Sequence, residues 1–168
     1  LTKGGSAVTA GVTLISSGDT VVWTPAANAN GTLNAFTVKA YDGTAASATA
    51  VQVQVSVAAA NDLPVASAGS FSTDEDTQSS AITLSGTDTE GSALTYKIIS
   101  LPAQGALHND VTAIGAGALP YTVTGVLKYT PVANYNGSDS FTFKANDGTG
   151  DSTAAATESI TVTAVNDA

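Results

Sequence analysis

Two carboxylates stand two residues apart, directly before a segment that is typical of a β-strand. They are Asp88 and Glu90, in the run TDTEGSALTY. In an irregular segment, such a pair can turn both carboxylates toward one cation, whereas on a flat strand the side chains stay about 7 Å apart. Calcium takes six to eight oxygen ligands from carboxylates, amide side chains and carbonyls. The pair is therefore a candidate part of a calcium site.

Other oxygen-bearing side chains occur where they could join this pair. Asp147 follows another expected strand, and Asn61-Asp62 lie in a short segment rich in Ala and Pro that ends one strand pattern and precedes the next. An acidic run, Asp74-Glu75-Asp76, is a further candidate cluster. Acids in turns are also common as solvated turn formers, so this plainer interpretation stays open for each of these residues taken singly.

Composition excludes several classes of function. The net charge is −9, and the five cations are all lysines, which disfavours binding to nucleic acid. One histidine and no cysteine cannot assemble a zinc site, and no phosphate-binding loop or nucleophile elbow is present. The sequence contains no run of eighteen apolar residues, so it does not predict a membrane-spanning helix. Paired acids without any sign of a cleft do not predict glycoside hydrolysis, so we expect no enzymatic activity.

The sequence repeats itself. VWTPAANANG at 22–31 returns as KYTPVANYNG at 128–137, and FTVKAYDGT at 36–44 returns as FTFKANDGT at 141–149. Asn61-Asp62 returns as Asn166-Asp167, a period of 166 − 61 = 105 residues. We expect a complete repeat over 62–168 and the C-terminal part of another over 1–61. This first part should be frayed, or completed by another copy.

Alternation of apolar and polar residues predicts half-buried strands in both parts. The clearest are Val51–Val57, Leu94–Ile98, Phe141–Lys144 and Ile160–Thr163. Asn-Gly and Asp-Gly pairs between them are turn formers, and no helical pattern is evident. These features predict an all-β fold, a Greek-key β-sandwich with about seven strands in a full repeat.

The remaining distinctive side chains have structural interpretations. Phe36, Phe141, Phe143 and Tyr96 are expected in the core, and Trp23 is expected to pack there rather than to stack on a sugar, because its counterpart is Tyr129. His108 is expected in a solvated loop. Surface charges are expected at Asp19, Asp110, Asp139, Asp151 and Glu158, with Asp139 the candidate exception.

A family resemblance rests on several of these motifs together. Asn61-Asp62-x-Pro64, Asp74-Glu75-Asp76, Asp88-x-Glu90 and Ala145-x-Asp147 resemble the motifs of a cadherin repeat. The chain is more closely similar to the bacterial cadherin-like tandem repeats of large adhesins that are secreted by the type I route (RTX-type). The resemblance implies a cadherin/immunoglobulin-like sandwich, located outside the cell or at its surface.

The resemblance also implies two calcium sites at repeat junctions. One would use Asn61, Asp62, Asp88, Glu90 and Asp147. The other would use Glu75 with Asp74 or Asp76, together with Asn134, Asn136, Asn166 and Asp167. Glu90 replaces the usual second Asp, so we expect fewer ions or weaker binding than at a typical cadherin junction.

Three classes of function follow from these observations. The first is a calcium-rigidified adhesive or spacer module whose partners are neighbouring repeats, and possible further partners are another copy, a cell-surface protein or a glycan. The second is a glycan- or protein-binding sandwich, for which exposed Tyr41, Tyr121 and Tyr135 would speak. The third is an accessory domain of a secreted enzyme. We favour the first.

Overall fold

The computed structural model describes residues 1–166 of the chain, which fold into strands and turns. Within these residues the only helical element is a single 3₁₀ turn, η1 (Ala116–Ala118). The prediction of an all-β fold is confirmed. The chain divides into two compact units, Leu1–Ala60 (unit 1) and Asn61–Ala168 (unit 2), which are described separately below.

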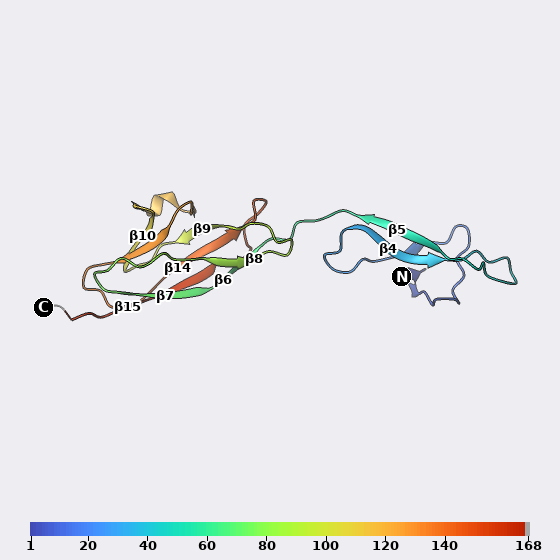
Figure 1. The fold of residues 1–168 in the computed structure, drawn as a ribbon, viewed down its shortest axis with the longest axis horizontal. Coiled ribbons are helices and arrows are strands. Elements are labelled where there is room, and N and C mark those ends of the chain that lie inside the picture. Colours follow the sequence, from blue (N-terminus) through green and yellow to red (C-terminus); the bar gives the residue numbers. More distant parts are fainter. Residues whose placement is uncertain (167–168) are drawn as a thin grey trace. The chain divides into compact units, whose positions relative to one another are not determined.

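Unit 2 is built on a mixed five-stranded sheet with the order β12-β9-β14-β15-β7. Strands β7, β9, β14 and β15 of this sheet are labelled in Figure 1. Long β14 pairs in antiparallel fashion with β9 and β15, and β7 adds to β15 in parallel. The bounds are β7 Gly69–Asp74, β9 Thr95–Ser100, β12 Tyr121–Thr122, β14 Gly137–Asn146 and β15 Ala156–Thr163.

Smaller sheets form the second layer of unit 2. One has the order β11-β10-β13, and the other pairs β6 with β8. The segment before β8 extends the first of them, because Ile82 bridges Leu127 and the amide of Ser79 donates to the carbonyl of Tyr129 at 2.8 Å. The bounds are β6 Val65–Ser67, β8 Ser85–Thr87, β10 Gly105–Asn109, β11 Thr112–Ala113 and β13 Leu127–Pro131.

The core of unit 2 lies between these layers. Alternate residues of β13, β14 and β15 point inward and are buried, as the period of two predicts. Phe141 and Phe143 are fully buried, which confirms their expected place, and half-buried Tyr96 packs edge-on against Phe143 with ring centroids 5.8 Å apart. Strands β6 to β15 outnumber the expected seven, because several two- and three-residue segments form ladders of their own.

Unit 1 reproduces part of this architecture. A three-stranded sheet has the order β2-β1-β3, and β4 pairs with β5. The register matches unit 2, since Thr2 pairs with Ala7 as His108 pairs with Ala113. None of residues 1–60, all of which the structure describes, is fully buried, so Phe36 and Trp23 are only half-buried. The bounds are β1 Thr2–Lys3, β2 Ser6–Ala7, β3 Val21–Val22, β4 Gly31–Val38 and β5 Val51–Val57.

Two expectations about single residues were wrong. Glu158 is not a surface charge, because it occupies an inward position of β15 and is 4% exposed. His108 lies in strand β10 rather than in a loop, because it pairs with Lys128 of β13. Both misassignments came from judging a residue by its polarity rather than by its place in the strand alternation.

No helix within residues 1–166 is long and apolar enough to cross a membrane.

Candidate metal site

Asp88 sits in the bend that follows β8, and its two carboxylate oxygens have different environments. Oδ1 accepts hydrogen bonds from the amides of Glu90 at 3.1 Å and Ser92 at 2.8 Å, which fixes the turn. Oδ2 is buried and has no hydrogen-bond partner, the only such side-chain atom among the described residues. A buried acceptor without a partner pays its full desolvation cost, so this oxygen is suited to a cation.

The segment Asn61-Asp62 is held against the body of unit 2 close to this turn. The amide of Asp62 donates to Oε2 of Glu90 at 3.2 Å, and the side-chain amide of Asn61 donates to Oδ2 of Asp147 at 2.8 Å. Together with the Asp88 turn, these hydrogen bonds link in series the five residues that the resemblance implies for one junction. We call Asn61, Asp62, Asp88, Glu90 and Asp147 the first cluster.

Asp147 is prepared to carry a negative charge. Its Oδ1 accepts from the amides of Thr149 at 2.6 Å and Gly150 at 2.7 Å, in a turn that follows β14. The donated side-chain hydrogen bond from Asn61, followed by these backbone amides, lowers the pKa of Asp147 below its ordinary value of 3.8. The carboxylate is therefore ionised at neutral pH, as calcium requires.

The second predicted set lies at the other end of β14, about 33 Å away for a strand of ten residues. Glu75 is 6% exposed, and its oxygens accept from the amide of Val165 at 2.7 Å and the side chain of Asn136 at 3.3 Å. Asp76 accepts from the amide of Asn134 at 2.9 Å.

The remaining members of the second set are Asp74, Asn166 and Asp167. Asp74 accepts from the hydroxyl of Thr163, and Asn166 follows Val165 in the chain. Asp167 lies outside the described residues. Both oxygens of Glu75 are bonded within the unit, and among the described residues of this set no oxygen matches the unpartnered one of Asp88.

No three His, Cys, Asp or Glu side chains among residues 1–166 converge closely enough to hold a metal ion by themselves. The first cluster offers four carboxylates, those of Asp62, Asp88, Glu90 and Asp147. Asp88 and Asp147 accept hydrogen bonds within their own turns, and Glu90 accepts one from the amide of Asp62. A cation there would need amide and carbonyl oxygens or water as further ligands. Such an all-oxygen set suits calcium rather than a softer transition metal.

Asp139, which the sequence placed among the surface charges as the candidate exception, is a structural acceptor. Its Oδ1 accepts from the amides of Ala103 and Ser140, and its Oδ2 accepts from the amide of Gln104 at 2.8 Å and the hydroxyl of Tyr129 at 2.9 Å. Burial, and then this hydrogen bond, raise the pKa of Tyr129. The sequence did hold one signal of this role, because Asp139 is an acid within the segment whose alternation predicts a strand.

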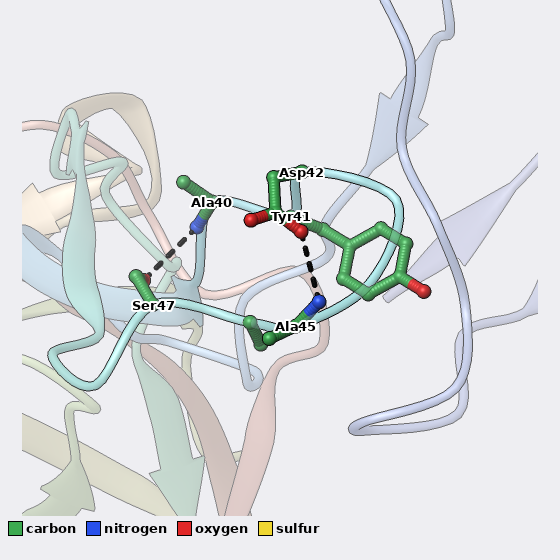
Figure 2. A pocket seen from close by; sticks show the side chains of 6 residues that line it. Ala40, Tyr41, Asp42, Ala45 and Ser47 are labelled. Atoms are coloured by element: carbon green, nitrogen blue, oxygen red, sulfur yellow. Dashed lines mark hydrogen bonds between the residues drawn. The ribbon is translucent and has the colours of Figure 1, made fainter.

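Unit 1 contains an open cavity of about 290 Å³ at the turn after β4 (Figure 2). Oδ1 of Asp42 accepts from the amides of Thr44 and Ala45, each at 2.8 Å, and half of Tyr41 is exposed beside it. Asp42 holds the position in unit 1 that Asp147 holds in unit 2.

Comparisons with known proteins bear on this arrangement. The bacterial cadherin-like domain family matches residues 61–164. No curated protein matches the chain. Among solved structures, an endo-fucoidan hydrolase from glycoside hydrolase family 107 aligns with 22% identity and a TM-score of 0.42 over 84% of this chain. The chain spans only 20% of that protein's length, and so low a score supports no inference about function.

Proposed function

The chain belongs to the bacterial cadherin-like domain family, and we propose that it is a calcium-binding repeat of an extracellular bacterial adhesin, with no catalytic activity of its own. In this proposal it serves as a spacer or adhesive module among neighbouring repeats. The parent would be a large adhesin secreted by the type I route, as the resemblance implies.

The observation that carries the proposal is the unpartnered Oδ2 of Asp88. Unsatisfied buried acceptors are rare in folded proteins, and each needs a compensating partner. The first cluster, to which Asp88 belongs, consists of oxygen-bearing residues from the segment Asn61-Asp62 and from two turns. Calcium takes such mixed carboxylate, amide and carbonyl ligands.

The proposed mechanism is electrostatic. Two hydrogen bonds, Asn61 to Asp147 and Asp62 to Glu90, hold the segment Asn61-Asp62 to the rest of unit 2. A bound ion would neutralise the mutual repulsion of the carboxylates and attract the oxygens of Asn61 and Asp62 to itself. The segment at the start of the repeat would then stiffen, which suits a module that transmits force along a chain.

Thermal unfolding of the chain in EDTA and in calcium tests the proposal. At about 2 mM calcium and a dissociation constant near 10⁻⁴ M, one site adds about 1.8 kcal/mol to the stability of the folded state. The unfolding midpoint of unit 2 should rise by several degrees. Magnesium at the same concentration should have a smaller effect.

Asp88→Asn is the most informative variant, because it keeps Oδ1 for the turn and replaces Oδ2 with an amide that cannot bind a cation. Asp110→Asn is the charge-matched control, since Asp110 caps a different turn through the amide of Val126. Calcium should stabilise the control and hardly affect Asp88→Asn. An equal response of the two variants, or none in the native chain, would refute the site.

A further inference from the structure

The chain crosses from one layer of unit 2 to the other between β6 and β7. Strand β6 pairs with β8, whereas β7, which begins at Gly69, pairs with β15 of the five-stranded sheet. A single exposed residue, Ala68, separates the two strands. Strand β7 is the last in the order β12-β9-β14-β15-β7, so its only neighbour in that sheet is β15. The start of β7 is therefore the end of an edge strand, directly after a crossover.

The carboxyl group of Glu158 lies beneath this crossover. Glu158 occupies an inward position of β15, opposite Gly69 of β7 and Phe141 of β14. A Cβ added to Gly69 would be 2.4 Å from Oε2 and 2.9 Å from Oε1 of Glu158. Both oxygens thus lie against the backbone of Gly69, in space that a glycine leaves free. Separation of this part of β7 from β15 would uncover the carboxyl group.

The elements packed against β15 supply no opposite charge to this carboxyl group. They are β7, β14 and β6. Their titratable residues are Asp74 of β7 together with Asp139 and Lys144 of β14, and β6 has none. Asp139 is an acceptor for Tyr129 and three backbone amides, and Lys144 occupies an outward position of its strand. Burial is the resolved cause that raises the pKa of Glu158.

The opposite end of β7 is fastened more firmly. The hydroxyl of Thr163 donates to the carbonyl of Thr73 at 3.3 Å and to the carboxylate of Asp74. The amide of Glu75 donates to the carbonyl of Thr163 at 2.9 Å, and Thr73 is buried. An edge strand held in this way separates more easily at Gly69 than at Asp74.

We propose that the carboxyl group of Glu158 is a proton-dependent lock on the start of strand β7. In its protonated form it stays beneath the crossover, and residues 69–71 remain paired with β15. In its ionised form it gains water when these residues separate, so ionisation favours the open form. Opening leaves the neighbouring edge of β15 exposed to solvent.

The direction of the pH dependence follows from the two environments. In the closed form burial raises the pKa of Glu158 above 4.5, whereas in the open form the carboxyl group is in water and its pKa returns toward 4.5. The open fraction is therefore constant below pH 4.5, rises as the pH passes from 4.5 to the closed-form pKa, and is constant above it.

Amide hydrogen exchange of the full chain, followed by NMR in EDTA, tests the lock. The EDTA makes the result independent of the proposed calcium site. Protection factors are used, because they remove the ordinary pH dependence of exchange. Between pH 4 and pH 7, the protected amides of residues 69–71 should lose at least about threefold in protection.

Urea distinguishes a local opening from global unfolding. Separation of a few residues exposes little surface, so the protection of residues 69–71 should hardly change in low urea. Amides that exchange by global unfolding lose protection steeply under the same conditions. A urea dependence at residues 69–71 equal to that of the slowest amides of β14 would overturn the proposal, because Glu158 would then act only on the stability of the whole unit.

Two variants assign the pH dependence to Glu158. Glu158→Gln cannot ionise, so its protection at residues 69–71 should agree within about twofold between pH 4 and pH 7. Asp110→Asn removes an exposed carboxylate from another turn and should keep the native loss of protection. A native pH dependence that persists in Glu158→Gln would refute the assignment.

A measurement on the native chain decides the question even if Glu158→Gln does not fold. The ¹³C shift of the Glu158 carboxyl carbon reports its own titration. The midpoint of this titration should lie above pH 4.5, and the loss of protection at residues 69–71 should be complete once the pH exceeds it. Protection that is equal at pH 4 and pH 7, or that falls only above the carboxyl titration, would show that this group does not control β7.

Discussion

Glu158 illustrates how position in a strand sets the chemistry of one residue. It is 4% exposed, and burial raises its pKa above the ordinary 4.5. The folded state therefore binds the proton more tightly than the unfolded state does. Stability from this group is highest below pH 4.5 and falls as the pH rises through the higher folded-state pKa.

Glu158→Gln should consequently stabilise unit 2 by about 1 kcal/mol at pH 7, because it removes a charge that burial disfavours. The gain should vanish below pH 4.5, where the native glutamate is protonated in both states. Urea unfolding at pH 7 and pH 4 measures both values. A variant that is equally stable or less stable at pH 7 would show that the carboxylate has a compensating partner in solution.

Asp147 and Asp151 act in the opposite pH window. The pKa of each is lowered, by Asn61 and Lys97 respectively as the leading causes, so their contributions are present above pH 3.8 and are lost as the pH falls below it. The acid limb below pH 3.8 should therefore remain in Glu158→Gln, which separates the two effects in one titration.

Asp139 should be the most costly single acid to remove. It accepts four hydrogen bonds and ties the loop before β10 to buried Tyr129. Asp139→Ala should lower the free energy of unfolding by about 2–3 kcal/mol, since the donors at Gln104 and Tyr129 lose an ionised acceptor. The urea midpoint should fall at constant slope, whereas Asp110→Ala, which loses one backbone bond, should cost about 1 kcal/mol.

Among the elements, the contact of β10 with β13 depends on a glycine. A Cβ at Gly105 would lie 2.3–2.5 Å from the ring of Tyr129, which is fully buried and cannot move aside. Gly105→Ala should therefore destabilise unit 2 by about 2–3 kcal/mol through overpacking. Gly115→Ala is the matched control, because nothing lies within 4 Å of a Cβ there. Similar unfolding midpoints for the two variants would contradict the packing.

The sequence predicted the long elements well, because alternation persists over enough residues to fix both the strand and its inward face. Val51–Val57 is β5 to the residue, and Phe141–Lys144 lies within β14. Short strands such as β11 and β12 were not predicted, because two residues are too few to show an alternation of apolar and polar side chains. The inward face of β15 was predicted at Ile160 but not at Glu158, where polarity was weighed above position.

The sequence named residues that the fold links by hydrogen bonds, and their role as metal ligands stays a prediction. Repeat spacing and oxygen chemistry grouped Asn61, Asp88 and Asp147, which the fold brings to one end of unit 2. Which carboxylate oxygen lacks a partner depends on how each turn closes, and the turn geometry cannot be predicted from the sequence in that detail. The opposite end carries the second predicted set, in which Glu75 accepts hydrogen bonds from two residues.

On the scale of the whole molecule, the two units differ in how much they bury. Unit 2 has a core that includes Tyr129, Phe141 and Phe143, whereas unit 1 contains no fully buried residue among residues 1–60. Small sheets without a buried face are marginally stable in water. Unit 1 should therefore unfold at lower urea than unit 2.

Trp23 makes this difference measurable, because the only tryptophan lies in unit 1. In EDTA, the Trp23 emission should change at lower urea than the main loss of strand signal in circular dichroism. About 2 mM calcium should move only the later transition, because the first cluster belongs to unit 2. Coincident transitions would show that the units unfold as one. A calcium-dependent shift of the Trp23 transition would instead contradict the assignment of the metal's effect to unit 2 alone.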